Sequence, residues 1–275
     1  MSSTSPPLPY RKDVRSQGEE AKAGEQVVTS GVIVTPPVIG LAAAAGHDRI
    51  VVHERPTVDV IVMGDELLDA GRSGEGRLRD SISPQVAGWL ESVGACLGVL
   101  TTVADQRRAT ADAIRGATGN VIITTGGTAR GPVDQLHPAL EELRASLIVD
   151  QVAVRPGHPM VLARLQDGRP LLGLPGNPLA ASVGFVSLGW PLIEAIRGLP
   201  LTAPSPSPLE GEITAPDNAH RLMPVQRTTN GVTPMLHHGP AMLSGLAAAD
   251  ALAIAPPGGA RSGELVDVLP LPWVR

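Results

Sequence analysis

Short apolar runs alternate with segments of helical pattern in the first half of the chain, and this alternation limits the available folds more than any other feature. The runs span residues 58–63, 97–103 and 121–123, and the helical segments that follow them span 80–93, 110–118 and 139–145. Strands joined through helices make right-handed crossovers, so the pattern predicts an α/β fold with a parallel sheet. Ligands of such sheets bind beyond the carboxyl ends of the strands.

The residues at those strand ends suit a charged ligand. Asp65 and Glu66 follow the first run, Asp105 follows the second, and the third opens into a glycine-rich loop at 126–131. Glycines let a ligand approach the backbone, and free N–H groups at the start of the next helix attract negative charge. Carboxylate oxygens are ligands that suit Mg²⁺. Each acid taken alone is as often a turn or cap residue, so the predicted site depends on the convergence of all three ends.

Four further side chains near the expected pocket leave alternatives open. Asp134 either caps the turn before the third helical segment or binds a ligand. Arg130, Arg155 and His158 are the nearest cations, and the planar fork of arginine suits phosphate or another oxyanion. Taken singly, each is more often a surface charge. However, the two prolines and the glycine of Arg155-Pro-Gly-His-Pro159 fix the shape of that segment, which is unusual for a mere surface loop.

Composition excludes several classes of protein. The net charge of −5, with acids and bases mixed along the chain, gives no basic footprint for nucleic acid and no polybasic patch for a membrane. The apolar run 31–45 is shorter than the roughly 20 residues that span a bilayer, and it predicts a short helix between Thr35 and Gly46. The polar start of the chain shows no signal peptide, so we expect a cytoplasmic protein. The single cysteine, Cys96, excludes an internal disulfide and is expected to be buried.

The second half of the chain predicts a hairpin, a long helix and a small β domain. A strand at 147–154 is followed by a hairpin at 160–174, by an apolar helix at 179–197, and then by a Pro- and Ser-rich segment, residues 200–209, that is expected to be a linker. Five short β-like runs follow, at 211–214, 222–228, 232–236, 252–254 and 265–269. Turn residues separate these runs, so residues 210–275 are expected to form a small β domain.

Several motifs, taken in order, resemble those of one family. They are Gly31-Val-Ile-Val-Thr-Pro36, Arg55-Pro-Thr-Val-Asp-Val-Ile-Val-Met-Gly-Asp-Glu-Leu67, Thr125-Gly-Gly-Thr128 with Asp134, Arg155-Pro-Gly-His-Pro159 and Gly173-Leu-Pro-Gly-Asn-Pro178. From about Val14 onward the chain resembles the molybdopterin molybdenumtransferases, which are MoeA and the E domain of gephyrin. Its central part is also similar to the molybdopterin adenylyltransferases, which are MogA and the G domain of gephyrin.

The resemblance implies a domain organisation. It implies a three-layer α/β/α molybdopterin-binding domain with a mostly parallel sheet at 55–199, the linker at 200–209 and the small C-terminal β domain at 210–275. Residues 1–54 would be an N-terminal segment with a short helix, the remnant of a larger family domain that in full members supplies part of a site completed across a dimer. The partners left open are therefore a second copy in a homodimer and a full-length family member.

The resemblance also implies roles for particular residues. Glu66, Asp105 and Asp134 would hold Mg²⁺ and, with Arg155, would be the catalytic residues. The residues expected to bind molybdopterin are Thr125, Gly126, Gly127, Thr128, Arg130, Gly131, Asp134, His158, Pro175, Gly176, Asn177 and Pro178. Arg155 and His158 stand where the family commonly has lysine, and so does the uncharged Gln151.

The implied function is a step of molybdenum cofactor biosynthesis. Molybdopterin and molybdate would be the substrates of a transferase that inserts molybdate into adenylylated molybdopterin, with Mg²⁺ as cofactor and with release of AMP. Two alternatives remain. The loop from Thr125 to Gly131 is closer to that of the adenylyltransferases, which would transfer the adenylyl group of ATP, whereas the replaced lysines favour a non-catalytic carrier of molybdopterin.

Overall fold

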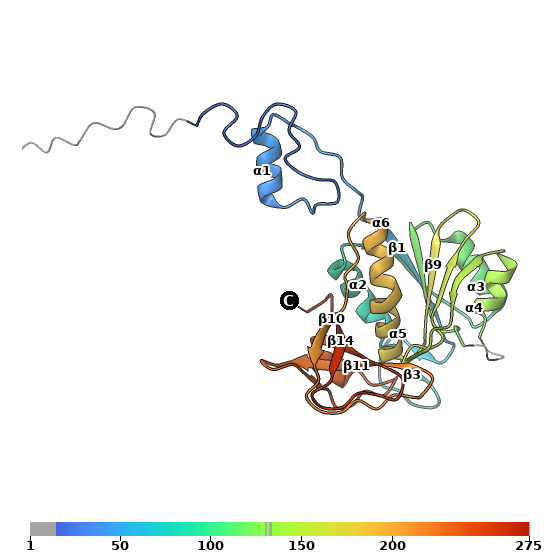
Figure 1. Cartoon of the computed structure of the whole chain (residues 1–275). Coiled ribbons are helices and arrows are strands. Elements are labelled where there is room, and N and C mark those ends of the chain that lie inside the picture. Colours follow the sequence, from blue (N-terminus) through green and yellow to red (C-terminus); the bar gives the residue numbers. More distant parts are fainter. Residues whose placement is uncertain (1–14, 130, 132–133, 275) are drawn as a thin grey trace, which may run out of the picture. The chain divides into compact units, whose positions relative to one another are not determined.

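The computed structural model describes residues 15–129, 131 and 134–274, and the chain divides into two compact units, Met1–Val52 and His53–Arg275. In the first unit, the helix α1 (Pro36–Ala44) follows Thr35 and ends before Gly46, whose φ is +84° (Figure 1). The predicted short helix is confirmed. Its two prolines occupy the first turn, where their fixed φ suits the helix, and the Thr35 side chain makes no capping hydrogen bond.

A six-stranded sheet forms the centre of the second unit. Its strands, in spatial order, are β4 (Cys96–Val103), β1 (Thr57–Met63), β5 (Val121–Thr125), β9 (Pro170–Leu174), β8 (Val161–Arg164) and β6 (Ser146–Asp150). The first four run parallel, and the last two are joined by antiparallel pairings. The prediction of a mostly parallel sheet is confirmed, and so is the hairpin between β8 and β9.

Helices cover both faces of this sheet, which gives the expected three layers (Figure 1). On one face, α2 (Ser83–Ser92) packs with the continuous helical segments α5 (Pro178–Gly184), η1 (Phe185–Gly189) and α6 (Trp190–Ile196). On the other face lie α3 (Arg107–Gly116) and α4 (Leu136–Glu142). Helices cover both faces of the central strands, so the side chains on both faces are apolar, as in other parallel sheets.

The helix boundaries follow from local chemistry. The Oδ1 atom of Asp80 accepts hydrogen bonds from the N–H groups of Ile82 and Ser83, at 2.9 and 3.1 Å, and α2 begins at Ser83, three residues later than expected. In contrast, α3 and α4 each begin three residues earlier than expected. In α4 the added turn starts with Leu136, which is fully buried between the helices and the sheet. Tertiary packing therefore extends the helix beyond its local sequence signal.

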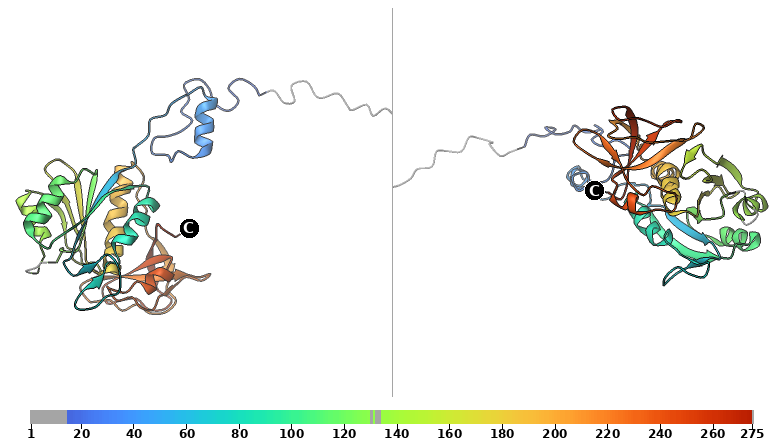
Figure 2. Two further views of the ribbon diagram at one scale, coloured as in Figure 1. Left: turned by 180° about the vertical axis from the view of Figure 1, so that it is seen from behind. Right: turned by 90° about the horizontal axis from the view of Figure 1, so that it is seen from below.

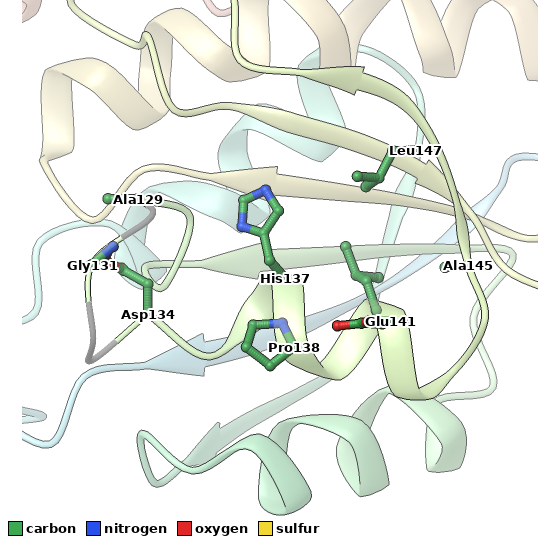
Figure 3. Close-up of a pocket in the computed structure, with 9 residues that line it drawn as sticks. Ala129, Gly131, Asp134, His137, Pro138, Glu141, Ala145 and Leu147 are labelled. Atoms are coloured by element: carbon green, nitrogen blue, oxygen red, sulfur yellow. Dashed lines mark hydrogen bonds between the residues drawn. The ribbon is translucent and has the colours of Figure 1, made fainter.

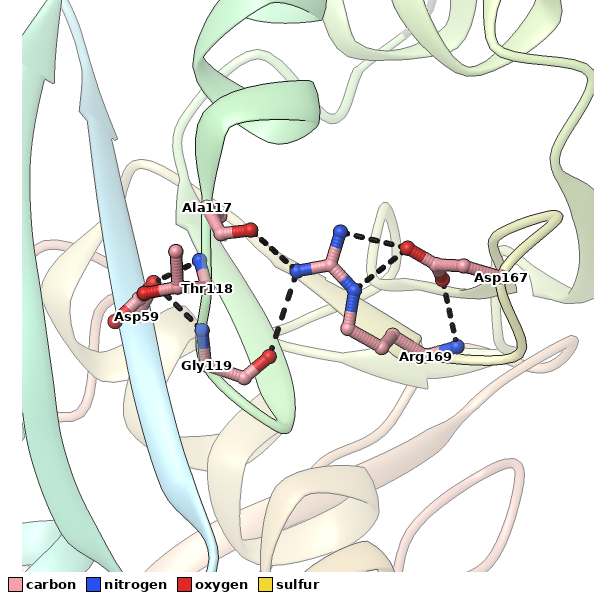
Figure 4. Close-up of polar contacts among 6 residues, drawn as sticks. All are labelled: Asp59, Ala117, Thr118, Gly119, Asp167 and Arg169. Carbon is pink, nitrogen blue, oxygen red and sulfur yellow. Dashed lines mark hydrogen bonds and ion pairs between the residues drawn. The ribbon is translucent and has the colours of Figure 1, made fainter.

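A buried carboxylate near the start of β1 joins several segments. Asp59 is 3% exposed and faces a bulge in β4, where two residues of β4 oppose Asp59 alone. Its carboxylate accepts the N–H groups of Val99, Thr118 and Gly119, each at 2.8 Å. Figure 4 shows the last two. Burial opposes the charge, but these hydrogen bonds outweigh it and hold the pKa of Asp59 below its ordinary value.

Arg169 holds the same turn from the other side. Its Nη1 atom donates a 2.6 Å hydrogen bond to the carbonyl oxygen of Ala117, and its guanidinium pairs with Asp167 at 2.7 Å (Figure 4). We call Asp59, Arg169 and the turn 117–119 the clasp. It lies at the amino ends of β1 and β5, opposite to the ends that the sequence predicts to carry the site.

The helix that runs through α5, η1 and α6 is long and apolar because it belongs to the core. By length and composition alone, Pro178–Ile196 would also suit a membrane span, but 61% of its most apolar window is buried within the protein. Phe185 is fully buried and stacks on Trp89 of α2, with ring centroids 5.2 Å apart. The burial accounts for the composition of the helix.

The C-terminal region forms a second sheet (Figure 2). Its strands, in spatial order, are β10 (Ser205–Pro208), β14 (Leu265–Pro270), β13 (Ala251–Ala255), β11 (His220–Arg227) and β12 (Val232–Pro234), with the short helix α7 (Ser244–Ala248) between β12 and β13. The predicted β domain is confirmed. The short strand β7 (Val154–Arg155) comes from the first half of the unit but pairs in parallel with β11. The C-terminal sheet therefore includes a strand from the first half of the unit.

Three sequence expectations were wrong. Residues 205–208 of the expected linker form β10, because an edge strand tolerates Pro206 and Pro208, which donate no hydrogen bonds. The run 211–214 is not a strand and makes only an isolated bridge through Ile213. Cys96 is exposed rather than buried, because β4 is the edge of its sheet.

Candidate functional site

One pocket lies at the carboxyl ends of four parallel strands. It has a volume of about 560 Å³ and is lined by Glu66 after β1, Asp105 after β4, the glycine turn 125–128 at the end of β5, and the turn 175–178 after β9. Sequence reasoning placed these residues at strand ends, and the topology brings them together. Asp134 also lines the pocket, from the segment that precedes α4.

The acidic side of the pocket concentrates negative charge. Asp65 and Asp105 each accept the backbone N–H of the other at 3.2 Å, which fixes the two strand ends against one another. Burial and the nearby charges of Asp65, Glu66 and Asp134 raise the pKa of Asp105, although the Asp65 amide partly opposes them. The fold therefore leaves this carboxylate without full compensation of its charge.

A divalent cation would relieve that charge. Over the residues that the structure describes, no group of three or more His, Cys, Asp or Glu side chains surrounds a common point as a metal cage would require. Mg²⁺ rarely needs such a cage, since it commonly keeps several waters and binds one or two carboxylates together with substrate phosphates. This mode fits Glu66, Asp105 and Asp134, which line one pocket. The charges of Glu66 and Asp134 contribute to the raised pKa of Asp105.

The glycine turn comes close to the end of β1. Gly126 and Gly127 have φ angles of +85° and +62°, which favour glycine. A Cβ atom at Gly126 would lie 2.7 Å from the carbonyl oxygen of Met63, so a side chain there would displace the backbone. Thr125 and Thr128 flank the two glycines and are buried. The turn thus offers backbone and hydroxyl groups rather than bulky side chains to the pocket.

The turn 175–178 forms the facing wall. A Cβ atom at Gly176 would lie 3.6 Å from the Cα atom of Gly126, so the two turns pass close to one another. Asn177 precedes α5, whose first amides at Leu179 and Ala180 donate to the carbonyl oxygen of Pro240 at 3.0 and 3.3 Å. Ala241, next to that proline, lines the pocket. The C-terminal region therefore contributes to the site.

The predicted cations are placed differently from the acids. Arg155 lies in β7 and donates from Nη1 to its neighbour's carbonyl oxygen at 3.1 Å, whereas the Nδ1 atom of His158 lies 2.7 Å from the Val152 carbonyl oxygen. Of this segment, Pro159 lines the pocket, and neither Arg155 nor His158 is among its lining residues. Arg130 lies outside the described residues.

Sequence reasoning missed Arg221, which pairs with Arg155 in the register of β7 and β11. Its Nη2 atom lies 2.8 Å from Nδ1 of His238, while its buried Nε atom has no hydrogen-bond partner among the described residues. Burial lowers the pKa of Arg221. Its position could not be read from local pattern, because two segments more than 60 residues apart create it.

Sequence reasoning also missed an arm that reaches the pocket. Two short parallel strands, β2 (Leu67–Leu68) and β3 (Leu78–Arg79), close the segment that was expected to be only a loop. We call residues 67–79 the arm. Ser73 and Arg79 of the arm line the pocket. Their only signal in the sequence was the richness of this segment in Gly and Arg.

A second hollow adjoins the first. Its volume is about 490 Å³ (Figure 3). Ala129 and Asp134 line both the hollow and the pocket, whereas Gly131 lines the hollow and not the pocket. The Asp134 carboxylate accepts the Gly131 N–H at 2.8 Å, so Asp134 does cap its turn. The ring of His137 projects into the hollow, with Nε2 2.9 Å from Oδ1 of Asp150.

Comparisons with known proteins find similarity over both regions of the second unit. Residues 59–195 match the family described as a probable molybdopterin binding domain, and residues 207–271 match the MoeA C-terminal region (domain IV). The molybdopterin molybdenumtransferase of Staphylococcus aureus strain N315 is 31% identical over 195 residues, which are 70% of this chain and 46% of the relative. That of Staphylococcus epidermidis strain ATCC 12228 is 29% identical over 271 residues, 94% of this chain and 64% of the relative.

Solved structures agree on the fold. The molybdopterin biosynthesis MoeA protein of Pyrococcus horikoshii is 23% identical, with a TM-score of 0.77 over 92% of this chain and 64% of that one. A molybdenum cofactor biosynthesis protein of Pyrococcus furiosus is 18% identical, with a TM-score of 0.71 over 92% of this chain and 82% of that one. The chain spans about half the length of the first curated relatives, 46% of each.

Proposed function

Because the chain belongs to the MoeA-like family, with a molybdopterin-binding domain followed by a MoeA C-terminal region, we propose that it acts in molybdenum cofactor biosynthesis. The proposed reaction is the Mg²⁺-dependent insertion of molybdate into adenylylated molybdopterin, with release of AMP. The observation that carries the proposal is the meeting of carboxylates and two glycine turns around one pocket of about 560 Å³. That volume lies in the usual range for small-molecule sites.

The two turns would hold the phosphate-bearing part of the ligand. Gly127 and Gly176 have no side chains, so phosphate oxygens can approach the backbone there. The N–H of Gly126 itself donates to the carbonyl oxygen of Leu174 at 2.9 Å. The hydroxyl groups of Thr125 and Thr128 can add hydrogen bonds from the same turn. Pro175 and Pro178 keep the facing turn rigid, so the ligand meets a wall that does not need to be ordered on binding.

The acids would hold the cation and orient the phosphates. Bound Mg²⁺ supplies charge neutralisation at phosphate oxygens. Asp105 would gain most from the cation, because burial and like charges raise its pKa in the protein alone. Glu66 and Asp134 would bind the cation directly or through water, from the ends of two other segments.

Release of AMP tests the proposed reaction. Purified protein is incubated with adenylylated molybdopterin, molybdate and Mg²⁺, and AMP is measured over time. We expect AMP from the unaltered chain and at least about tenfold less from Glu66→Gln, a loss typical of a disturbed metal site. Glu75→Gln is the matched control, because Glu75 lies on the exposed part of the arm and does not line the pocket. Absence of AMP from the unaltered chain rejects the insertase.

The positions of the cations favour a second candidate, a protein that binds molybdopterin without turning it over. Arg155 and His158 replace lysines common in the family, and neither lines the pocket. Tight binding of molybdopterin with no AMP release at saturating Mg²⁺ would establish the carrier. The Thr125-Gly-Gly-Thr128 loop keeps adenylyl transfer as a third reading. Formation of adenylylated molybdopterin from ATP and molybdopterin would identify that activity.

A further inference from the structure

The arm presents two arginines in nearly the same way. Nη2 of Arg77 donates to the carbonyl oxygen of Leu67 at 2.9 Å, and Nη1 of Arg79 donates to that of Leu68 at 3.2 Å. Both side chains therefore hold β2 by a single described hydrogen bond, and both are exposed. They differ in one respect: Arg79 lines the pocket, whereas Arg77 does not.

Arg79 is the one cation among the described residues that line this pocket. The acids that line it are Glu66, Asp80, Asp105 and Asp134. No ion pair joins Arg79 to any of them within the described part of the chain, and Oδ1 of Asp80 is occupied by the amides at the start of α2. A guanidinium has five N–H donors, and one of them is used here. Its remaining donors are available to a ligand.

Ser73 adds a second donor beside Arg79. Its Oγ atom accepts the backbone N–H of Arg79 at 3.0 Å, so the two residues are held together. A hydroxyl group also carries one O–H donor, and Ser73 lines the pocket, so it can donate a hydrogen bond to a ligand there. A guanidinium fork with a neighbouring hydroxyl is a pair of donors that suits a tetrahedral oxyanion.

We propose that Arg79 and Ser73 form an oxyanion-binding wall of the pocket, opposite in charge to its acidic wall. The ligand group is a tetrahedral oxyanion, either a phosphoryl group or molybdate. The inference rests on the proposed function only for the identity of that oxyanion. Anion binding itself requires no turnover, so it is tested separately from AMP release.

The test is equilibrium binding of three probes to the whole chain, by calorimetry with Mg²⁺ present: AMP, inorganic phosphate and molybdate. Arg79→Gln should weaken binding of at least one probe by about tenfold or more, as expected when a hydrogen bond from a charged group is lost. Arg77→Gln is the matched control and should change affinity less than about twofold, since it removes the equivalent bond to β2 outside the pocket. Arg79→Lys should retain part of the affinity, because it keeps the charge but loses the fork.

The outcomes separate the ligand sources and the alternatives. A loss confined to AMP and phosphate assigns the wall to a phosphoryl group, and a loss confined to molybdate assigns it to the metal oxyanion; either result supports the proposal. Equal losses in Arg77→Gln and Arg79→Gln would show that the arm acts only through its folding and would overturn it. Failure of the unaltered chain to bind any probe would also overturn it. Anion binding without AMP release would reject the insertase and leave this wall standing.

Discussion

Asp59 and Asp105 lie near opposite ends of the parallel strands of the same sheet, and their pKa values shift in opposite directions although burial opposes the charge of each. At the start of β1, three backbone amides at 2.8 Å surround Asp59, and the pKa of this residue is lowered. Beyond the carboxyl end of β4, Asp105 is partly buried, receives one described amide at 3.2 Å and faces the charges of neighbouring acids, so its pKa is raised. The backbone amides at the clasp compensate the negative charge of Asp59, whereas the pocket leaves the charge of Asp105 only partly compensated.

The contrast separates structural from functional acids by a physical criterion. Where the fold itself supplies the donors, as for Asp59, the charge stabilises the fold and needs no ligand. Where the fold supplies like charges instead, as for Asp105, the stabilising partner must come from outside, as a proton or a cation. Residue type alone does not make this distinction, because both residues are aspartates and burial opposes the charge of each.

The largest effect is expected from Asp59→Ala. It leaves the N–H groups of Val99, Thr118 and Gly119 without an acceptor, at about 1–3 kcal/mol for each buried group, so the free energy of unfolding should fall by at least about 3 kcal/mol. Urea denaturation at neutral pH measures it. Asp167→Ala is the control: that side chain is 51% exposed, and its loss should cost less than about 1 kcal/mol. Similar losses in both variants would remove the special role of Asp59.

A smaller effect is expected from pH. Because the pKa of Asp59 is lower in the folded chain, the unfolded chain takes up the proton first as pH falls below the ordinary value of 3.8. Its contribution to stability is complete above that pH and is lost as pH falls toward the folded pKa. Asp105 acts with the opposite sign, since its raised pKa makes its ionised form a cost that protonation removes.

Asp59→Asn should therefore flatten the acid limb of the stability curve. Urea denaturation is repeated between about pH 6 and pH 3, and the slope below the ordinary pKa is compared between the variant and the unaltered chain. The unaltered chain should lose stability more steeply. An equal slope in the two proteins would mean that other acids dominate, contrary to the comparison drawn here.

The smallest effect on stability is expected from Asp105→Asn. The amide oxygen can still accept the Asp65 N–H, and a repulsive charge is removed, so the free energy of unfolding at neutral pH should stay within about 1 kcal/mol or rise. Mg²⁺ affinity, measured by calorimetry, should fall by at least about tenfold. Asp112→Asn, on the exposed surface of α3, should change neither quantity. A large loss of stability in Asp105→Asn would place Asp105 in the same class as Asp59.

The sequence predicted the parts of this site that follow from topology. Glu66, Asp105 and Gly126 each follow an apolar run, and the carboxyl ends of parallel strands must meet at one edge, so their proximity required no knowledge of packing. The same reasoning could not find Asp59. Its partners lie in a bulge of β4 and in a turn 59 residues away, and a bulge leaves no period in the sequence.

Other errors arose where one composition fits two structures. Proline excludes a central strand but not an edge strand, so Pro206 and Pro208 did not distinguish a linker from β10. Cys96 was expected to be buried because free cysteine is usually a buried residue type, and the sequence does not show that its strand lies at the edge of the sheet. Arg79 and Ser73 were missed because the arm returns to the pocket through pairing between β2 and β3, and two-residue strands carry no pattern.

The pairing of β7 with β11 has a consequence for how the second unit comes apart. A strand from the first half of this unit is hydrogen-bonded into the C-terminal sheet, and one apolar core joins Val154 of β7, Leu179 of α5 and Leu252 of β13. Detaching the C-terminal sheet on heating would therefore break the β7–β11 hydrogen bonds and expose this core to water. The pocket has Pro159 and Ala241 in its walls. We therefore expect residues 53–275 to unfold in one cooperative transition in which the whole pocket is lost at once.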